Sequence, residues 1–433
     1  MKFYNINTPN KLVSLKEAVL TGIQGTDGLY MPQSIPTMPA SFFERLPGLS
    51  LQQIAYEVTQ AMLGDDLNNE TIKHITGQAV YFQIPLVQVE EGVYSLELFH
   101  GPTLAFKDVG ARFMAGLFEH LLQEDETQIH ILVATSGDTG GAVANAFYNK
   151  KGIRVTILYP SGKVSPLQKL QLTTLGGNVH ALEVNGTFDD CQRMVKQAFN
   201  DASIQDKINL ASANSINFAR LFPQSFYYYY AYGQMQQLHP NSQVVLSVPS
   251  GNFGNLTAGL LAKQTGLPIN KFIAANNANN VVEEYLQTGK YTPRPSVQTI
   301  SNAMDVGAPS NFSRMLNLYN NSYDAMKADV AGYSYNDDET RACIDEVLKL
   351  HNYLLDPHGA VGYLALKEYL KDTPEMQGIV LETAHPCKFS EVVEEVIDMK
   401  VAIPEALQQM QGKPAYKQYI EADYEKLKAY LVI

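Results

Sequence analysis

The feature that most constrains this fold is a regular alternation of short apolar runs with longer helical stretches, which starts near Val87. VQVEEGVYSLELF reads as two strands, and the later runs have the length and composition of buried strands: IHILVAT, RVTILYP, NVHALEV, QVVLSVPS, NKFIAAN and GIVLET. Strands separated by helices predict right-handed strand–helix–strand units and mostly parallel sheets. Because ligands of such sheets bind beyond the carboxyl ends of the strands, chemistry is expected in the residues that follow each run.

The first 80 residues have a different pattern and predict a mainly helical unit. After a strand-like KFYN, Ser14 and Glu17 have the spacing of a capping box and predict a helix over Leu15–Leu20. A second helix is predicted from Ser50, with apolar residues at three- to four-residue spacing. It is expected to end at Gly64 in the left-handed cap position.

Composition narrows the class of protein. Gly and Pro together make 51 of the 433 residues, which excludes collagen-like and low-complexity chains. The charge of 32 − 44 = −12, without a basic stripe, argues against a nucleic-acid partner. Three distant cysteines favour a reducing compartment and predict neither a disulfide framework nor a metal site. Without an apolar export segment or span, a cytoplasmic location away from the membrane is expected.

Two glycine-rich turns follow predicted strands and precede predicted helices. They are ATSGDTGG, which contains Thr135, Ser136, Asp138 and Thr139, and PSGNFGN, which contains Gly251, Asn252, Phe253, Gly254 and Asn255. Small residues let backbone N–H groups converge on an anion at a helix N-terminus. Each turn alone is as compatible with a simple tight connection, but two together favour a ligand with two anionic groups. Neither matches a dinucleotide fingerprint or a nucleotide P-loop.

Lys107 stands among apolar neighbours in FHGPTLAFKD, where a predicted strand joins a helix. Burial and the positive helix end both favour its free amine, which is the form that attacks an aldehyde. Asp108 opposes this by stabilising the cation. The alternative is that Lys107 extends to solvent or pairs with Asp108.

Thr383 and Lys388 follow the last predicted strand in ETAHPCKF. They offer a ligand one hydroxyl and one cation. The alternative is that Thr383 caps a helix and Lys388 is a solvated surface charge. An amine nucleophile, a phosphate cradle and a hydroxyl at a strand end are what a protein needs to hold pyridoxal phosphate. A second anion site would then take a substrate carboxylate.

Eight ordered motifs resemble the threonine synthase family, pyridoxal-phosphate enzymes of the fold type II group. The motifs are GTDGLYMP, HGPTLAFKD, ATSGDTGGA, NSINFAR, VPSGNFGN, AMDVGAPSNFSR, DPHGAVGY and ETAHPCKF. The resemblance implies an α/β fold of mostly parallel twisted sheets with flanking helices, in two domains around a cleft. It implies an N-terminal unit over 1–80, a larger cofactor domain over 81–124 and 236–433, and a smaller domain over 125–235.

The resemblance also assigns roles to residues. Lys107 carries the cofactor and acts in catalysis, Thr383 faces the ring nitrogen, and Asp138 lies beside the ring hydroxyl. The cofactor phosphate falls to Gly251, Asn252, Phe253, Gly254 and Asn255, and the substrate carboxylate loop comprises Thr135, Ser136 and Thr139. For the substrate phosphate the candidates are Lys388 first, then Arg220, Asn214 and Lys163.

Three residues depart from the family pattern. Asp138 replaces the asparagine of many fold type II relatives, Gly359 stands where threonine is expected, and Cys387 stands where alanine is commoner.

The activity that the resemblance implies is conversion of O-phospho-L-homoserine and water to L-threonine and phosphate, by γ-elimination and β-addition of water. The nearest alternative is a phospho-lyase of the same fold that releases 2-oxobutyrate, ammonia and phosphate. A non-catalytic binder is disfavoured by the Schiff-base lysine, and a nucleotide-binding regulator by the missing P-loop. The expected partner is this small substrate alone, in a monomer or homodimer.

Overall fold

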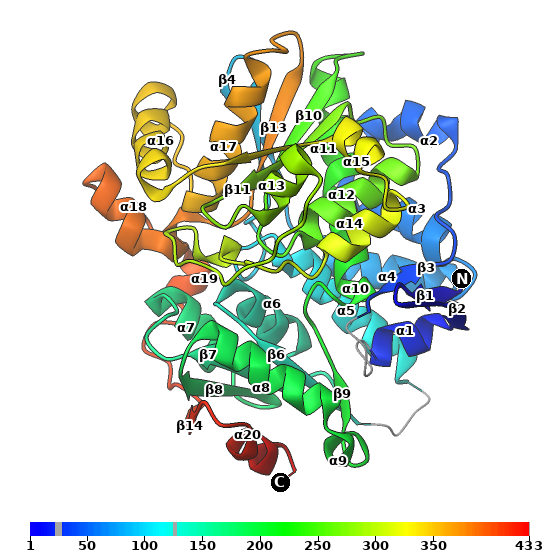
Figure 1. Ribbon diagram of the computed structural model, residues 1–433, viewed down its shortest axis with the longest axis vertical. Helices are drawn as coiled ribbons and strands as arrows, with labels where there is room; N and C mark the ends of the chain where they lie inside the picture. The colour runs from blue at the N-terminus through cyan, green and yellow to red at the C-terminus, as the bar shows by residue number, and fades with distance from the viewer. Residues whose placement is uncertain (22–27, 124–127, 433) are drawn as a thin grey trace.

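Two large sheets and one small sheet organise the chain in the computed structural model, which describes residues 1–21, 28–123 and 128–432. Figure 1 shows the five-stranded sheet around β6, β7 and β8 in the lower half, and the six-stranded sheet around β10, β11 and β13 in the upper half. The first three residues of the motif GTDGLYMP and the predicted boundary after residue 124 lie outside the described residues.

The six-stranded sheet has the order β12-β11-β10-β13-β5-β4, and its strands are parallel except for the antiparallel β4–β5 pair. Its strands are β4 (Leu86–Glu90), β5 (Val93–Glu97), β10 (Val244–Pro249), β11 (Lys271–Asn276), β12 (Val330–Ser334) and β13 (Gln377–Glu382). β10 and β13 are almost wholly buried, as expected for strands covered by helices on both faces.

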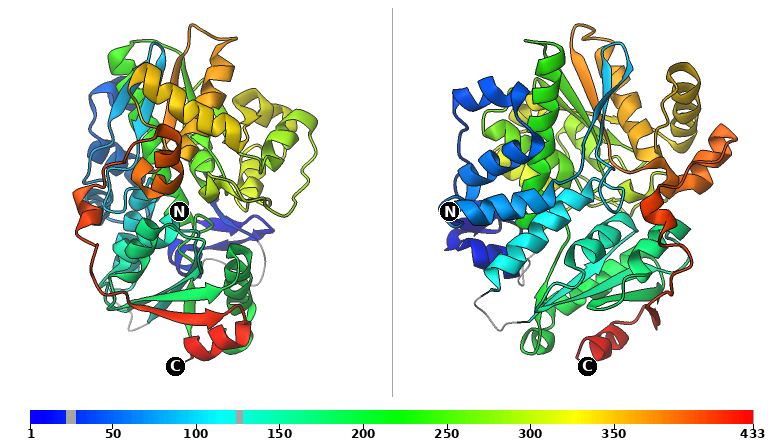
Figure 2. Two further views of the ribbon diagram at one scale, coloured as in Figure 1. Left: turned by 90° about the vertical axis from the view of Figure 1, so that its left-hand side faces the viewer. Right: turned by 180° about the vertical axis from the view of Figure 1, so that it is seen from behind.

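The five-stranded sheet has the order β14-β8-β7-β6-β9 and is entirely parallel. Its strands are β6 (Ile129–Ala134), β7 (Ile153–Pro160), β8 (Val179–Asn185), β9 (Asn209–Ala211) and β14 (Lys417–Glu421). β14 comes from the end of the chain, which returns beside the C-terminal helix at the lower edge (Figure 2). The domain division inferred from the resemblance places this strand with the larger unit, whereas its hydrogen bonds join it to the smaller sheet.

The first 80 residues hold a small antiparallel sheet of order β2-β1-β3 besides their helices. The elements are β1 (Phe3–Asn5), β2 (Thr8–Val13), α1 (Leu15–Thr21), β3 (Tyr30–Pro32), α2 (Ala40–Arg45), α3 (Leu51–Leu63) and α4 (Asn69–Ala79). The predicted helix starts are confirmed: Ser14 Oγ accepts from the Glu17 N–H, and Ser50 makes a full capping box with Gln53. The left-handed cap is wrong, because Gly64 has a φ of −66° and continues the helical turn.

Helices cover both faces of the two large sheets (Figures 1 and 2). Those of eight or more residues are α5 (Lys107–Leu121), α6 (Asp138–Phe147), α7 (Pro166–Thr173), α8 (Phe188–Asn200), α11 (Phe226–Leu238), α12 (Gly254–Gln264), α13 (Val281–Thr288), α16 (Asp337–His351), α17 (Pro357–Leu370), α18 (Ser390–Ile397) and α20 (Tyr424–Leu431). The shorter ones are α9 (Ala202–Gln205), α10 (Phe218–Leu221), α14 (Phe312–Leu318), α15 (Tyr323–Asp329) and α19 (Glu405–Gln408). Within the described ranges, no helix has the length and apolar character needed to cross a membrane.

The aromatic cluster at the start of α11 is core. Phe226, Tyr227, Tyr228 and Tyr229 are fully buried. The Tyr227 hydroxyl donates a hydrogen bond to the carbonyl of Phe106, the residue just before Lys107. The cluster therefore packs the layers together and supports the segment that leads into α5.

Candidate active site

A cavity of about 820 Å³ is lined by residues that follow strands of both large sheets. Thr135, Ser136, Asp138 and Thr139 come after β6, Gly251, Asn252, Phe253, Gly254 and Asn255 come after β10, and Thr383 comes after β13. Lys107, Asn214 and Arg220 complete the set of predicted residues that line it. The carboxyl ends of the strands thus meet at one site, as the alternating pattern predicts.

Two chain segments pair to bring Lys107 beside Thr383. The Phe106 N–H donates to the Thr383 carbonyl at 2.9 Å, and the His385 N–H donates to the Leu104 carbonyl at 3.1 Å. Leu104 has a φ of +57°, which turns the chain sharply into α5. Lys107 is the first residue of that helix, so its amine is held at a helix N-terminus next to the end of β13.

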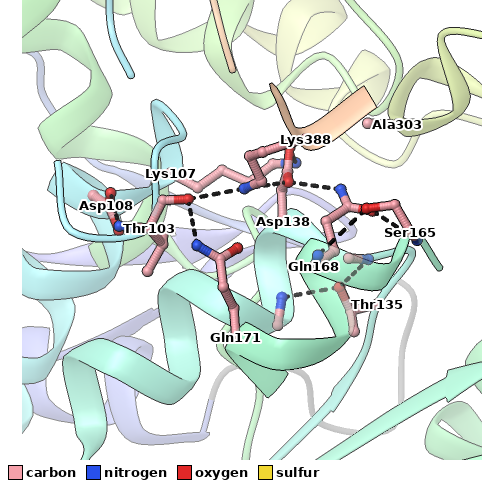
Figure 3. A network of polar contacts seen from close by, with 12 residues as sticks. Thr103, Lys107, Asp108, Thr135, Asp138, Ser165, Gln168, Gln171, Ala303 and Lys388 are labelled. Atoms are coloured by element: carbon pink, nitrogen blue, oxygen red, sulfur yellow. Dashed lines mark hydrogen bonds and ion pairs between the residues drawn. The ribbon is translucent and has the colours of Figure 1, made fainter. Parts of the chain in front are cut away.

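The amine of Lys107 faces Asp138. Its side chain is 16% exposed, and Nζ lies 3.9 Å from Asp138 Oδ2. Burial lowers the pKa of Lys107, an effect that Asp138 opposes and that the charges of Lys388 and Arg220 reinforce. The predicted influence of Asp108 is wrong, because the Thr103 N–H and hydroxyl donate to this carboxylate at 2.9 and 2.6 Å. Figure 3 shows Asp108 turned toward Thr103.

The turn after β10 is a rigid cradle. A Cβ at Gly251 would lie 2.7 Å from the Met304 Cα, and one at Gly254 would lie 2.7 Å from the Ser215 Cβ, so neither position has room for a side chain. Phe253 has a φ of +60°, a strained value for an aromatic residue that functional loops commonly hold. The loop is tied from outside, since the Ser310 N–H donates to Asn252 Oδ1 at 2.6 Å.

The turn after β6 is organised by Thr135. Its hydroxyl accepts from the Gly137 and Gly140 N–H groups, both at 2.9 Å. Those two donors are therefore used inside the turn and do not point at a ligand. Ser136 and Thr139 are only partly buried and line the cavity, so they remain available to a bound group.

Five residues of the lining have buried polar atoms without a hydrogen-bond partner among the described residues. The donors are Arg220 Nε and Nη1 and Asn255 Nδ2, and the acceptors are Asn214 Oδ1, Gln224 Oε1 and Asn302 Oδ1. Burial lowers the pKa of Arg220 to about 10, so the guanidinium keeps its charge at neutral pH. A buried charge without a partner costs stability. The unpaired donors of Arg220 and Asn255 are what a site for an anionic ligand presents.

Two predicted cations do not line the cavity. Lys388 is fully buried behind it and lies 2.6 Å from Asp138 Oδ1. Lys163 is exposed in the turn after β7 and is likewise not among the lining residues. Of the four candidates for a substrate phosphate, the structure brings Arg220 and Asn214 to the cavity.

His358 and Asp305 also line the cavity, although the sequence assigns them no role. The Ala303 N–H donates to His358 Nε2 at 3.2 Å, and His358 Nδ1 lies 2.5 Å from Asp356 Oδ2. Asp305 accepts from Thr299 and two asparagines, and burial raises its pKa to about 6. His358 belongs to the motif DPHGAVGY and Asp305 to the motif AMDVGAPSNFSR, so these motifs were the sequence signal for the two residues.

These residues fit pyridoxal phosphate. The cavity supplies a lysine amine of lowered pKa, a glycine cradle with the unpaired Asn255 amide, and the Thr383 hydroxyl next to that lysine. Residues 80–381 match the family model described as pyridoxal-phosphate dependent enzyme. Fold and site therefore define an enzyme of this class, with pyridoxal phosphate as its cofactor.

Residues 2–80 and 359–431 match the models of the threonine synthase N terminus and C-terminal region. The chain belongs to the threonine synthase family.

Full-length relatives agree with this assignment. The threonine synthase of Haemophilus influenzae is 43% identical over 100% of both chains. The crystal structure of threonine synthase from Escherichia coli superposes with a TM-score of 0.93 at 41% identity, covering 100% of this chain and 99% of that one. The structure of PLP-bound threonine synthase from Brucella melitensis has a TM-score of 0.92 at 34% identity, covering 100% and 99%.

Proposed function

We propose that this cavity converts O-phospho-L-homoserine and water to L-threonine and phosphate. The observation that carries the proposal is that one cavity contains both the lysine Lys107 and a second cation, Arg220, which has guanidinium nitrogens without a hydrogen-bond partner. A substrate with a carboxylate and a phosphate needs an anion site besides the cofactor cradle. The relatives at 40–43% identity over the full chain carry the name of this activity.

Residues around the cofactor are proposed as follows. Gly251, Asn252, Phe253, Gly254 and Asn255 would hold the phosphate, because their turn begins α12 and its N–H groups favour an anion. Thr383 would meet the ring nitrogen and Asp138 the ring hydroxyl. When bound, pyridoxal phosphate supplies an electron sink for carbanion chemistry at the substrate.

Lys107 would also move protons at the substrate Cα. Burial lowers the pKa of its amine, which increases the share of free base that could accept a proton. Ser136 and Thr139, with the turn that Thr135 organises, would bind the substrate carboxylate at the start of α6. Arg220 would donate from Nε and Nη1 to the substrate phosphate, which leaves as the inorganic ion, and Asn214, which also lines the cavity, would donate from its amide nitrogen.

The test is a product balance. Purified protein with pyridoxal phosphate is incubated with O-phospho-L-homoserine, and phosphate, threonine and 2-oxobutyrate are measured in the same sample. Phosphate matched by threonine supports the proposal, and phosphate matched by 2-oxobutyrate would transfer the function to a phospho-lyase. Absence of phosphate release would refute the substrate itself.

A matched pair of cation variants tests the phosphate site. Arg220→Met should raise KM for O-phospho-L-homoserine by at least about tenfold, because a charge-assisted bond contributes about 1.5–3 kcal/mol. Lys163→Met removes an equal charge from an exposed position outside the cavity and should leave KM unchanged. Equal effects of the two variants would contradict the assignment.

We also propose a cytoplasmic enzyme that acts as a monomer or homodimer and binds no nucleic acid. Its larger unit comprises 81–124 and 236–433 except β14, and its smaller unit comprises 125–235 together with β14, which pairs with β8. The thiols of Cys191, Cys343 and Cys387 are buried and form no disulfide, which suits a reducing compartment. Light scattering of the purified protein tests the assembly state.

A further inference from the structure

A buried ion pair lies directly behind the cavity. Lys388 Nζ is 2.6 Å from Asp138 Oδ1, and the two side chains are 0% and 3% exposed. Lys388 lies in the short helical turn Pro386–Phe389 after β13, whereas Asp138 begins α6. The pair therefore joins the ends of two different sheets (Figure 3).

Both members of the pair are held by further hydrogen bonds. Lys388 Nζ also donates to the Thr103 carbonyl at 2.9 Å. Gln168 Nε2 donates to Asp138 Oδ1 at 2.8 Å. These bonds leave Asp138 Oδ2 directed at Lys107 Nζ, 3.9 Å away. One carboxylate thus lies between two lysines, and only Lys107 reaches the cavity.

The charges around Lys107 come from four elements. Asp138 on α6 and Asp356 before α17 favour its protonated form, while Lys388 and Arg220 disfavour it. Burial alone would raise the pKa of Asp138, but the charges of Lys388 and Lys107 outweigh it and bring the pKa well below its usual range. Without Lys388, the Asp138 carboxylate would have Lys107 as its remaining close cation.

We propose that Lys388 is a positioning residue that aligns the Asp138 carboxylate and balances its charge, and so limits how strongly Asp138 holds a proton on the nitrogen of Lys107. This rests on the proposed role of Lys107 as the residue that carries the cofactor. Lys388 does not line the cavity, so it would act on Lys107 through its own charge and through Asp138. The pair also explains why an aspartate works at position 138, since its charge is balanced within the protein.

The test is a pH titration of the holoenzyme, followed by the absorption of the cofactor bound through Lys107. Loss of Lys388 in Lys388→Met leaves the Asp138 charge facing Lys107 alone. The titration midpoint should therefore rise by at least about one pH unit, since one unit corresponds to about 1.4 kcal/mol of differential interaction. The conservative variant Lys388→Arg keeps the charge and should stay close to the parent.

The double variant Asp138→Asn with Lys388→Met removes both charges and should bring the midpoint back toward the parent value. It also leaves neither member of the pair as an uncompensated charge, which keeps the test usable if Lys388→Met alone fails to fold. Lys151→Met is the control for loss of one positive charge, because Lys151 is exposed in the turn before β7 and does not line the cavity.

An unchanged midpoint in Lys388→Met, or a midpoint shift in the double variant as large as in the single one, would overturn the proposal. A loss of stability with no shift would likewise reduce the pair to a structural role. Because no substrate is used, this titration remains informative even if the product balance fails to show threonine.

Discussion

Gly359 offers a quantitative test of how the chain accommodates a buried carboxyl beside the site. A Cβ at this position would lie 1.6 Å from Glu382 Oε2. Glu382 is fully buried, and its Oε1 accepts from the Asp356 N–H at 2.7 Å. Burial and the Asp356 charge raise the pKa of Glu382 well above its ordinary value. Glu382 therefore occupies the space that a side chain at position 359 would need.

Gly359→Ala should destabilise the protein by about 1–4 kcal/mol. Overpacking a core costs about 1–3 kcal/mol. Moving Glu382 aside also sacrifices its bond to the Asp356 N–H, worth about 1–2 kcal/mol for a buried group. Against these stands a gain of about 1 kcal/mol from replacing glycine by alanine in a helix, since Gly359 lies in the first turn of α17.

The assay compares denaturant unfolding of two glycine variants. Gly77 lies exposed in α4 with no atom within 4 Å of a Cβ placed on it, so Gly77→Ala should stabilise slightly. Gly359→Ala should lower the unfolding midpoint in the parent but have no such cost in a Glu382→Ala background. If the two alanine variants behave alike, or if the loss persists without Glu382, the steric reasoning is refuted.

Three other perturbations have defined outcomes. The Tyr228 hydroxyl donates to the Asn255 carbonyl at 2.8 Å, so Tyr228→Phe should weaken cofactor binding about fivefold, measured by absorption titration. Arg314 is fully buried and donates to three backbone carbonyls, so Arg314→Lys should cost about 3 kcal/mol in denaturant unfolding. Burial lowers the pKa of His130 to about 3, so the unfolded chain takes up that proton first. Stability should therefore fall as pH drops from about 6.5, and His130→Asn should flatten this slope; an unchanged slope would contradict the assignment.

The sequence predicted the framework of the site because that framework depends on local patterns. The strand-like runs were confirmed, and the glycine-rich turns and Thr383 follow β6, β10 and β13 at the edge where parallel strands end. Apolar periodicity and turn residues determine such elements within a few neighbours along the chain.

Charge pairing could not be predicted in the same way. Asp108 follows Lys107 directly in sequence, yet adjacent helical residues point in different directions, and this carboxylate bonds to Thr103 instead. Lys388 looked available to a ligand, but its partner Asp138 lies 250 residues earlier in the chain.

The sequence by itself determined the fold class, the family and the strand ends that line the cavity, and it predicted Lys107 as the cofactor lysine, since short-range patterns and ordered motifs encode these. Only the tertiary structure decided which cations reach the cavity and which are neutralised behind it. Arg220 lines the cavity without a partner while Lys388 is fully buried against Asp138. The physical reason is that burial and electrostatic pairing depend on distances between segments remote in sequence, which no local pattern specifies.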